Sequence, residues 1–233
     1  MNIAVIIAGG CGHRMKNEIP KQFLNVNDKP VVVYTLEAFQ EHPGIDEIGV
    51  VCIEGWETIL SAYAKQYKIT KLKWVVPGGD CGQASIRHGV EEAEKHYSPD
   101  DILLIHDAIR PNVSADIISD CIAQCQAHGS AVSVVPCNTA VLLKSDLESS
   151  EKIVDRDTLA LTQTPQAFTL QKLSWAHKEA LARGITNSVA SCTLMAELGE
   201  KLYFSVGSET NIKLTTPDDL LIFKALLTLS ENS

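Results

Sequence analysis

The chain has 233 residues, of which 45% are hydrophobic and 21% are charged, a balance typical of a packed globular protein. It carries 20 Lys and Arg against 29 Asp and Glu, and the resulting net charge of −9 argues against a nucleic-acid-binding or membrane-binding surface. No apolar run approaches the ~20 residues that are needed to span a bilayer.

The start of the chain and its cysteines indicate a cytoplasmic protein. Met1 leads directly into an apolar strand, so no signal peptide is visible. The seven cysteines are odd in number and scattered, which suits a reducing compartment. Cys121, Cys125 and His128 have a spacing that metal ligands can show, but their Ile-rich helical segment favours buried packing. We expect one domain over residues 1–233.

Strand-like and helix-like segments alternate along the first 135 residues. Short β-branched runs predict strands, and apolar residues at helical spacing predict helices. The alternation predicts an α/β fold, a Rossmann-like, mostly parallel sheet flanked by helices, with ligands at the carboxyl ends of the strands. The expected strands are residues 3–7, 48–53, 73–76, 102–105 and 131–135, and the expected helices are residues 31–39, 57–67, 84–96 and 115–127.

The alternation stops between residues 136 and 163. We expect a protruding β-arm here, a hairpin whose apolar strand residues one chain would cover poorly. Pairing with a second subunit, and therefore a homodimer, would cover them, whereas a plain surface hairpin is the alternative. The remaining chain predicts helices at residues 170–182 and 191–198, a strand at 202–206 and a last helix from about residue 218.

A glycine-rich loop follows the first strand. Glycine lets the backbone turn sharply and approach a ligand, and turned backbone N–H groups bind phosphate. The Walker pattern is absent, and the dinucleotide pattern fails because Met15 replaces its third glycine. With Arg14 and Lys21 beside it, the loop predicts a polyphosphate site, and a mere strand-to-helix turn is the alternative. The loop residues are Ala8, Gly9, Gly10 and Gly12.

A carboxylate and a cation follow the strand at residues 102–105. Asp107 stands at the carboxyl end of that strand, where a crevice is expected, and Arg110 is three residues further on. Magnesium takes oxygen ligands, commonly one or two carboxylates together with substrate phosphates. Asp107 is therefore the candidate ligand for a metal, and Arg110 is a candidate phosphate contact. A structural role for Asp107 in capping the next turn is the alternative.

Several motifs together resemble one family. Residues 8–15 read A-G-G-C-G-H-R-M and residues 20–24 read P-K-Q-F-L, followed by H-D-A-I-R-P at 106–111, Q-T-P-Q-A-F at 163–168 and N-I-K-L-T-T-P at 211–217. These stretches resemble sugar-phosphate nucleotidyltransferases, in the branch that holds 2-C-methylerythritol 4-phosphate and ribitol-5-phosphate cytidylyltransferases. The resemblance implies the nucleotidyltransferase fold, a dimerisation arm at about residues 136–163, and Mg²⁺ or another divalent cation. It also implies transfer of CMP from CTP to a polyol phosphate, with release of pyrophosphate.

The resemblance also implies roles for individual residues. The catalytic cations would be Arg14, Lys21 and Lys213. The glycine loop and a second stretch would bind the nucleotide, and this second stretch comprises Gly78, Gly79, Asp80 and Ser85. The acceptor would be bound by Asp107 and Arg110 of one subunit together with Thr139 and Arg156 from the arm of the other. Gly82 stands where the family has an arginine, which weakens the inference about the cytosine base.

The acceptor is the least determined part of the prediction. Residues 189–193 read V-A-S-C-T, where methylerythritol enzymes show T-D-[DE]-A-S and ribitol enzymes show a D-A-C-K-like stretch. The acidic residue is missing and Cys192 alone matches the ribitol branch. We expect ribitol 5-phosphate as acceptor, ahead of 2-C-methylerythritol 4-phosphate and of another polyol phosphate. An NAD(P)-dependent reductase and a non-catalytic nucleotide-binding relative are the alternatives from other classes.

Overall fold

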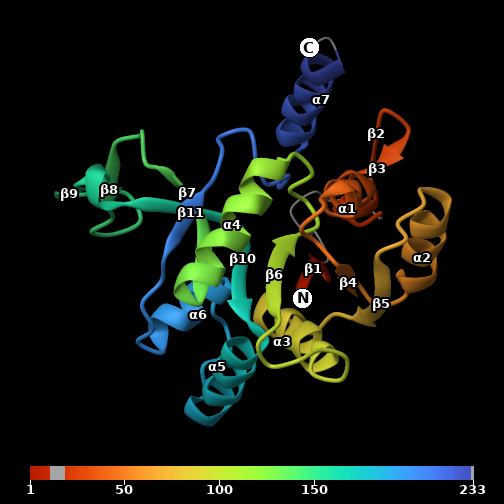
Figure 1. The fold of residues 1–233 in the computed structure, drawn as a ribbon. Helices are drawn as coiled ribbons and strands as arrows, with labels where there is room; N and C mark the ends of the chain where they lie inside the picture. The colour runs from red at the N-terminus through yellow and green to blue at the C-terminus, as the bar shows by residue number, and fades with distance from the viewer. Residues whose placement is uncertain (11–18, 232–233) are drawn as a thin grey trace.

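The computed structural model describes residues 1–10 and 19–231. Within these residues a central sheet of seven strands has the order β11-β7-β10-β6-β1-β4-β5 (Figure 1). All neighbouring strands pair in parallel except β10, which is antiparallel to both β6 and β7. The strands are β1 (Asn2–Ala8), β4 (Glu47–Cys52), β5 (Leu72–Pro77), β6 (Ile102–Asp107), β7 (Ser130–Pro136), β10 (Ala160–Thr169) and β11 (Phe204–Val206).

Helices cover both faces of the sheet, so the core has two apolar layers. One layer packs against α1 (Val31–Glu41), α2 (Glu57–Gln66) and α4 (Ala115–His128). The other packs against α3 (Gly82–Ala93), α5 (Leu170–Arg183) and α6 (Ser191–Glu197). These boundaries confirm the predicted α/β fold, with helix ends shifted by a few residues from the predicted positions.

The central strand β1 shows why this sequence forms a sheet that is buried on both faces. Side chains alternate across a strand, so neighbouring residues face opposite layers. Ile3 and Val5 pack in the layer with α3, whereas Ala4 and Ile6 pack in the layer with α1. All four are fully buried, as expected for a strand with helices on both sides. The carboxyl end of β1 and the glycine loop that follows it therefore lie at one edge of the sheet.

The Q-T-P-Q-A-F stretch at residues 163–168 contains a proline and nevertheless forms part of a strand. These residues lie in β10, between β6 and β7 near the middle of the sheet. Pro165 is tolerated there because the pairing of β10 with β7 shifts register between Thr162 and Gln166, where the proline's missing N–H breaks no regular ladder bond. β10 therefore places polar side chains beside the carboxyl ends of β1 and β6.

The arm is present and leaves the main sheet between β7 and β10 (Figure 1). It consists of β8 (Val141–Leu143) and β9 (Lys152–Val154), which pair antiparallel with each other. The side chains of Leu142, Leu147 and Ile153 are 60%, 93% and 84% exposed. The described chain thus leaves the apolar residues of the arm uncovered, in agreement with the sequence pattern.

The remaining elements are small or terminal. A 3-10 helix, η2 (Lys21–Phe23), precedes a short hairpin of β2 (Asn25–Val26) and β3 (Lys29–Pro30), and η3 (Arg156–Thr158) follows the arm. The last helix, α7 (Pro217–Glu231), packs Phe223 against a third apolar cluster. In the part of the chain that the structure describes, no helix has the length and apolar character to cross a membrane.

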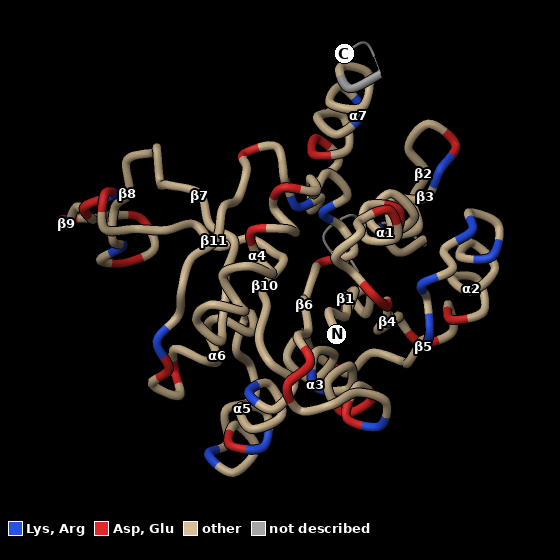
Figure 2. Tube along the Cα trace, in the orientation of Figure 1, with Lys and Arg blue, Asp and Glu red and all other residues tan. Residues whose placement is uncertain are grey.

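Two features of side-chain placement bear on the earlier expectations. Cys121 and Cys125 are buried in the core, which confirms the packing interpretation, and all six described cysteines are unpaired. Both acidic and basic residues lie on the outer helices α2, α3 and α5 and on the arm (Figure 2).

Candidate active site

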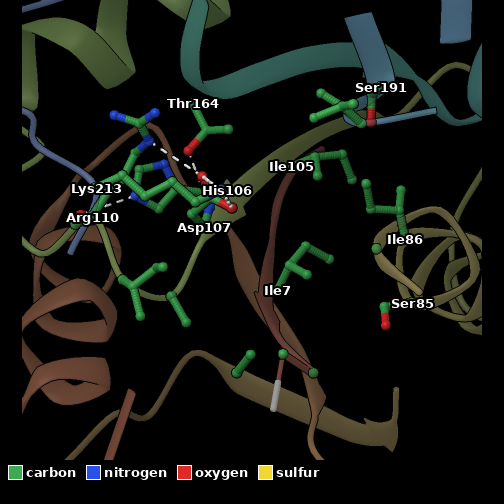
Figure 3. A pocket seen from close by; sticks show the side chains of 18 of the residues that line it. Ile7, Ser85, Ile86, Ile105, His106, Asp107, Arg110, Thr164, Ser191 and Lys213 are labelled. Atoms are coloured by element: carbon green, nitrogen blue, oxygen red, sulfur yellow. Dashed lines mark hydrogen bonds and ion pairs between the residues drawn. The ribbon is translucent and has the colours of Figure 1, made fainter. Parts of the chain in front are cut away.

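A cavity of about 620 Å³ opens where β1 and β6 end (Figure 3). Segments distant in sequence border it: the glycine loop, η2, the start of α3, the end of β6 with the loop that follows, β10, the loop before α6, and Lys213. The following predicted site residues line it: Ala8, Gly9, Gly10, Lys21, Gly79, Asp80, Ser85, Asp107, Arg110 and Lys213. Gly12 and Arg14 lie outside the described residues, so their assignments stay predictions.

The two glycine-containing segments touch each other at the base of the cavity. A Cβ on Gly9 would come within 3.3 Å of the Gly78 Cα and within 2.9 Å of the Ser85 Oγ. Glycine is therefore required at position 9 for the two backbones to approach this closely. Ser85 Oγ also accepts a hydrogen bond from the Gly79 N–H at 3.0 Å, which holds the second loop against α3. Gly78 thus packs against the glycine loop but does not itself line the cavity.

A buried glutamine ties η2 to the glycine loop. Gln22 is 1% exposed, and its Nε2 donates to the carbonyl oxygen of Ala8 at 2.6 Å and to that of Gly10 at 3.2 Å. The neighbouring Lys21 is thereby held at the cavity, which it lines. Lys21 was identified from the sequence, whereas Gln22 was given no role, although it stands beside Lys21 in the family-like motif P-K-Q-F-L.

A carboxylate and two cations form the polar centre of the cavity (Figure 3). Lys213 Nζ lies 3.0 Å from the carboxylate of Asp107, and Arg110 Nε lies 3.2 Å from Asp107 Oδ2. Burial alone would raise the pKa of Asp107, but the positive charges of Lys213 and Arg110 outweigh it and hold the pKa below its ordinary value. Asp107 is therefore ionised at neutral pH and orients both cations.

Buried polar groups behind this centre fix its geometry. The Thr164 hydroxyl accepts a hydrogen bond from the Asp107 N–H at 3.0 Å. Arg110 Nη1 donates to the Asn211 carbonyl oxygen at 2.6 Å, and the side-chain amide of Asn211 donates in turn to the carbonyl of Thr164 at 2.9 Å. His106 Nε2 lies 3.1 Å from the carbonyl oxygen of Arg110, and burial lowers the pKa of its imidazole to about 4. The neutral imidazole therefore adds no charge beside the cations at neutral pH.

The described side chains do not by themselves fit a metal site. No group of three or more His, Cys, Asp or Glu in residues 1–10 and 19–231 is placed to hold a metal ion. Asp107 already contacts two cationic side chains. Both of its carboxylate oxygens lie close to Lys213 Nζ, and one of them also contacts Arg110. A divalent cation prefers several oxygen ligands. The assignment of Asp107 as a metal ligand therefore stays a prediction.

The two arm residues assigned to the acceptor lie apart from the cavity of their own chain. Thr139 and Arg156 are exposed and are absent from the cavity lining. Arg156 Nη1 donates to the carbonyl oxygen of Asn138 at 3.1 Å, so it is held close to Thr139 on the arm. Within one chain the structure does not bring these two residues together with Asp107 and Arg110.

The loop before α6 forms one more wall of the cavity, with Val189, Ala190 and Ser191 in the lining. Sequence reasoning noted this stretch for its lack of an acidic residue but gave no role to Ser191, which is 3% exposed. It also gave no role to the buried amides of Gln83, Gln166 and Asn211, because their partners are far away in the sequence. Gln166 and Asn211 do stand in two of the family-like motifs, which was a usable signal.

The mostly parallel sheet, the arm and a cationic cavity beside a glycine loop define the nucleotidyltransferase fold. A family model described as "IspD: 2-C-methyl-D-erythritol 4-phosphate cytidylyltransferase" matches residues 2–229, and the chain belongs to this family of cytidylyltransferases. The predicted family and enzyme class are thereby confirmed.

Individual relatives fall into both branches of the predicted family. The chain is 44% identical over 229 residues to a ribitol-5-phosphate cytidylyltransferase of Lacticaseibacillus paracasei, which covers 97% of this chain and 98% of the relative. It is 35% identical over 228 residues to a 2-C-methyl-D-erythritol 4-phosphate cytidylyltransferase of Clostridium botulinum, with 97% of each chain covered. The crystal structure of 2-C-methyl-D-erythritol 4-phosphate cytidylyltransferase from Francisella tularensis superposes with a TM-score of 0.81 at 26% identity, covering 97% of this chain and 99% of that one.

Proposed function

We propose that this protein transfers CMP from CTP to ribitol 5-phosphate, giving CDP-ribitol and pyrophosphate. The observation that carries the proposal is the 44% identity, over nearly the whole of both chains, to a relative of that name. Cys192 points the same way, because it is the residue at positions 189–193 that matches the ribitol branch. Transfer to 2-C-methylerythritol 4-phosphate is the second candidate, supported by relatives of 34–37% identity.

The proposed reaction is an in-line displacement at phosphorus. An oxygen of the acceptor's phosphate attacks the α-phosphorus of CTP, a new P–O bond forms, and the bond to the β-phosphate oxygen breaks as pyrophosphate leaves. The acceptor phosphate is already nucleophilic, so the protein mainly positions the reactants and neutralises charge. The cavity offers suitable groups, because cationic Lys21, Arg110 and Lys213 all line it. Arg14, outside the described residues, would complete the set.

The nucleotide and the acceptor would occupy different sides of the cavity. The glycine loop with Gly78, Gly79, Asp80 and Ser85 would take CTP, since closely packed glycines leave backbone groups open to a ligand. Arg110 and Lys213, held by Asp107, would take the phosphate of the acceptor. A divalent cation, Mg²⁺ in our expectation, would enter with the triphosphate, whose oxygens are ligands that it prefers.

The assembly would be a homodimer in the cytoplasm. The exposed apolar residues of the arm need a cover, which a second copy would provide. The family resemblance implies that Thr139 and Arg156 of the arm then reach the cavity of that second copy. Six unpaired cysteines in the described chain are consistent with a reducing compartment.

The test is pyrophosphate release with CTP and Mg²⁺, comparing ribitol 5-phosphate with 2-C-methylerythritol 4-phosphate. We expect turnover with ribitol 5-phosphate and a kcat/KM at least tenfold lower with the other acceptor. Turnover with 2-C-methylerythritol 4-phosphate alone would replace the first candidate by the second. CTP binding without pyrophosphate release from any polyol phosphate would instead support a non-catalytic nucleotide-binding protein.

A further inference from the structure

The loop between α5 and α6 crosses the rim of the cavity. Val189, Ala190 and Ser191 line the cavity, and Val189 is 89% exposed while Ser191 is 3% exposed. The loop contains no charged residue between positions 185 and 191. Any recognition by this wall therefore depends on its shape, on its uncharged polar groups and on where its backbone is held.

One buried side chain holds this loop. Gln83, in the first turn of α3, donates from Nε2 to the carbonyl oxygen of Ile185 and accepts at Oε1 from the N–H of Ser188, both at 2.7 Å. Gln83 is 8% exposed, so these bonds are largely sheltered from water. Removing the amide would leave two backbone groups of the loop without partners, which weakens the loop's position. Gln83 itself does not line the cavity.

The same helix start carries an adjoining wall. Residues on either side of Gln83 in the sequence line the cavity next to the glycine loop. They are Gly79, Asp80, Ser85 and Ile86. The side chain of Gln83 thus links the wall proposed for the nucleotide with the loop at residues 185–191. From the other direction, Gln166 of β10 accepts a hydrogen bond from the Cys192 N–H at 2.9 Å, which fixes the end of the loop.

The loop also supplies a polar group that lacks a partner. Ser191 Oγ is shielded from water and makes no hydrogen bond with any residue that the structure describes. It lies near Ile86 and Ile105 at the cavity edge, away from Lys213 and Arg110 (Figure 3). A buried hydroxyl without a partner is costly in the free protein and gains a hydrogen bond if a ligand hydroxyl meets it. A polyol chain whose phosphate lies at the cations offers such hydroxyls.

We propose that Gln83 is a positioning residue that sets the loop at residues 185–191 as the wall selecting the acceptor's carbon chain, with Ser191 as the wall's polar contact. The inference rests on the proposed function. It concerns how the acceptor is discriminated, whereas the cations act on every phosphate alike.

The first experiment compares Gln83→Met with Gln40→Met. Gln40 is a matched control, since its amide also bridges two segments, accepting from the Lys71 N–H at 2.9 Å and donating to Thr70 Oγ1 at 3.1 Å, outside the cavity. We expect Gln83→Met to raise the KM for the polyol phosphate and to change the ratio of kcat/KM between the two acceptors, each about tenfold. The Kd for CTP should change less than twofold.

A conservative variant distinguishes positioning from general stability. Gln83→Glu keeps the acceptor for the Ser188 N–H and loses the donor to Ile185, so it should restore part of the acceptor discrimination. Gln40→Met should leave the acceptor ratio unchanged even where its Tm falls as much as that of Gln83→Met. Equal acceptor ratios in wild type, Gln83→Met and Gln40→Met would overturn the assignment of Gln83.

The second experiment compares Ser191→Ala with Ser188→Ala. Both hydroxyls are buried without a partner among the described residues, yet Ser191 alone of the two lines the cavity. Neither substitution removes a hydrogen bond of the free protein, and each removes a buried hydroxyl without a partner, so neither should lower the Tm. We expect Ser191→Ala to raise the KM for the acceptor about tenfold and Ser188→Ala to leave it unchanged. Equal values for the two would overturn the role of Ser191.

Failure of the proposed function has a different signature. If wild-type protein releases no pyrophosphate with CTP and any polyol phosphate, the proposed function is wrong and the inference about the acceptor wall is wrong with it. If wild-type protein turns over and only the variants behave alike, the inference alone is wrong.

Discussion

Asp107 and Lys213 are 106 positions apart in the sequence, and Lys213 Nζ lies 3.0 Å from the Asp107 carboxylate at the edge of the central sheet. Arg110 approaches the same carboxylate from the loop after β6. The carboxylate keeps two positive charges from separating, and both cations remain at the cavity. We expect this arrangement to act as a preorganised anion site before any substrate is bound.

Lys213→Ala tests that site. The side chain of Lys213 is 42% exposed, so its ion pair contributes little to the free energy of unfolding. Loss of a cation that stabilises developing charge should lower kcat/KM by about 10²–10³-fold, by analogy with the loss of an oxyanion-hole donor. Pyrophosphate-release kinetics and urea unfolding measure the two effects separately.

Lys178→Ala is the matched control for that prediction. Lys178 also pairs with a carboxylate, Glu94 at 2.8 Å, but stands on α5 away from the cavity. It should change neither kcat/KM nor the unfolding free energy appreciably. Lys213→Ala with wild-type turnover would exclude Lys213 from the anion site.

Gly9→Ala tests the contact between the two glycine segments. A Cβ at position 9 would press on the Gly78 backbone and on Ser85 Oγ, so we expect a loss of about 1–3 kcal/mol in unfolding free energy and weaker binding of CTP. Gly10→Ala is the control, because a Cβ there has no neighbour within 4 Å among residues 1–10 and 19–231. Its unfolding free energy should stay within about 0.5 kcal/mol of wild type. Equal unfolding curves for the two variants would contradict the close approach.

His177→Leu should stabilise the protein. His177 is 4% exposed on α5, and neither ring nitrogen has a partner among the described residues. Replacing an unsatisfied buried imidazole with an apolar side chain of similar size should raise the unfolding free energy at pH 7 by about 1–3 kcal/mol.

The pH dependence of the His177 effect has a definite sign. Burial, reinforced by the charge of Arg87, lowers the pKa of His177 to about 4, below its ordinary value near 6.5. The unfolded chain therefore binds the proton more readily, and wild-type stability falls as pH drops from about 6.5 toward 4. His177→Leu should exceed wild type by a further ~2 kcal/mol at pH 5. Urea unfolding at pH 7 and pH 5 measures this, with the exposed His96→Leu as control; an advantage that does not grow at pH 5 would refute the argument.

The arm can be tested by charge. Leu142 and Ile153 are 60% and 84% exposed on β8 and β9, so replacing both with Asp should leave the folded subunit intact and abolish pairing of the arm with a second copy. We expect the double variant to be a monomer by light scattering and to lose turnover. Leu221→Asp, at a 68% exposed position on α7, should stay a dimer. A monomeric wild-type protein would reject the dimer, and a dimeric double variant would show that the arm is not its interface.

The sequence by itself determined the alternating α/β order, the glycine loop, the identity of the acid and the cations, and the family. These features depend on local patterns: β-branched runs, helical spacing, and motifs within a few residues. The position of β10 in the sheet could not be obtained in this way. The stretch containing Pro165 looks like a turn locally, and only its pairing with β6 and β7 makes it a strand.

Only the tertiary structure decided which residues meet. Asp107 meets Lys213, Gln83 meets Ile185 and Ser188, and Gln166 meets Cys192 because helix and strand packing bring distant segments to one edge of the sheet. A glutamine carries no periodic signal, and its role depends on the unpaired backbone groups that the fold places within its reach. The motifs that carry the chemistry can therefore be identified in this sequence. The contacts that hold the cavity walls together arise from long-range packing, which the sequence does not reveal.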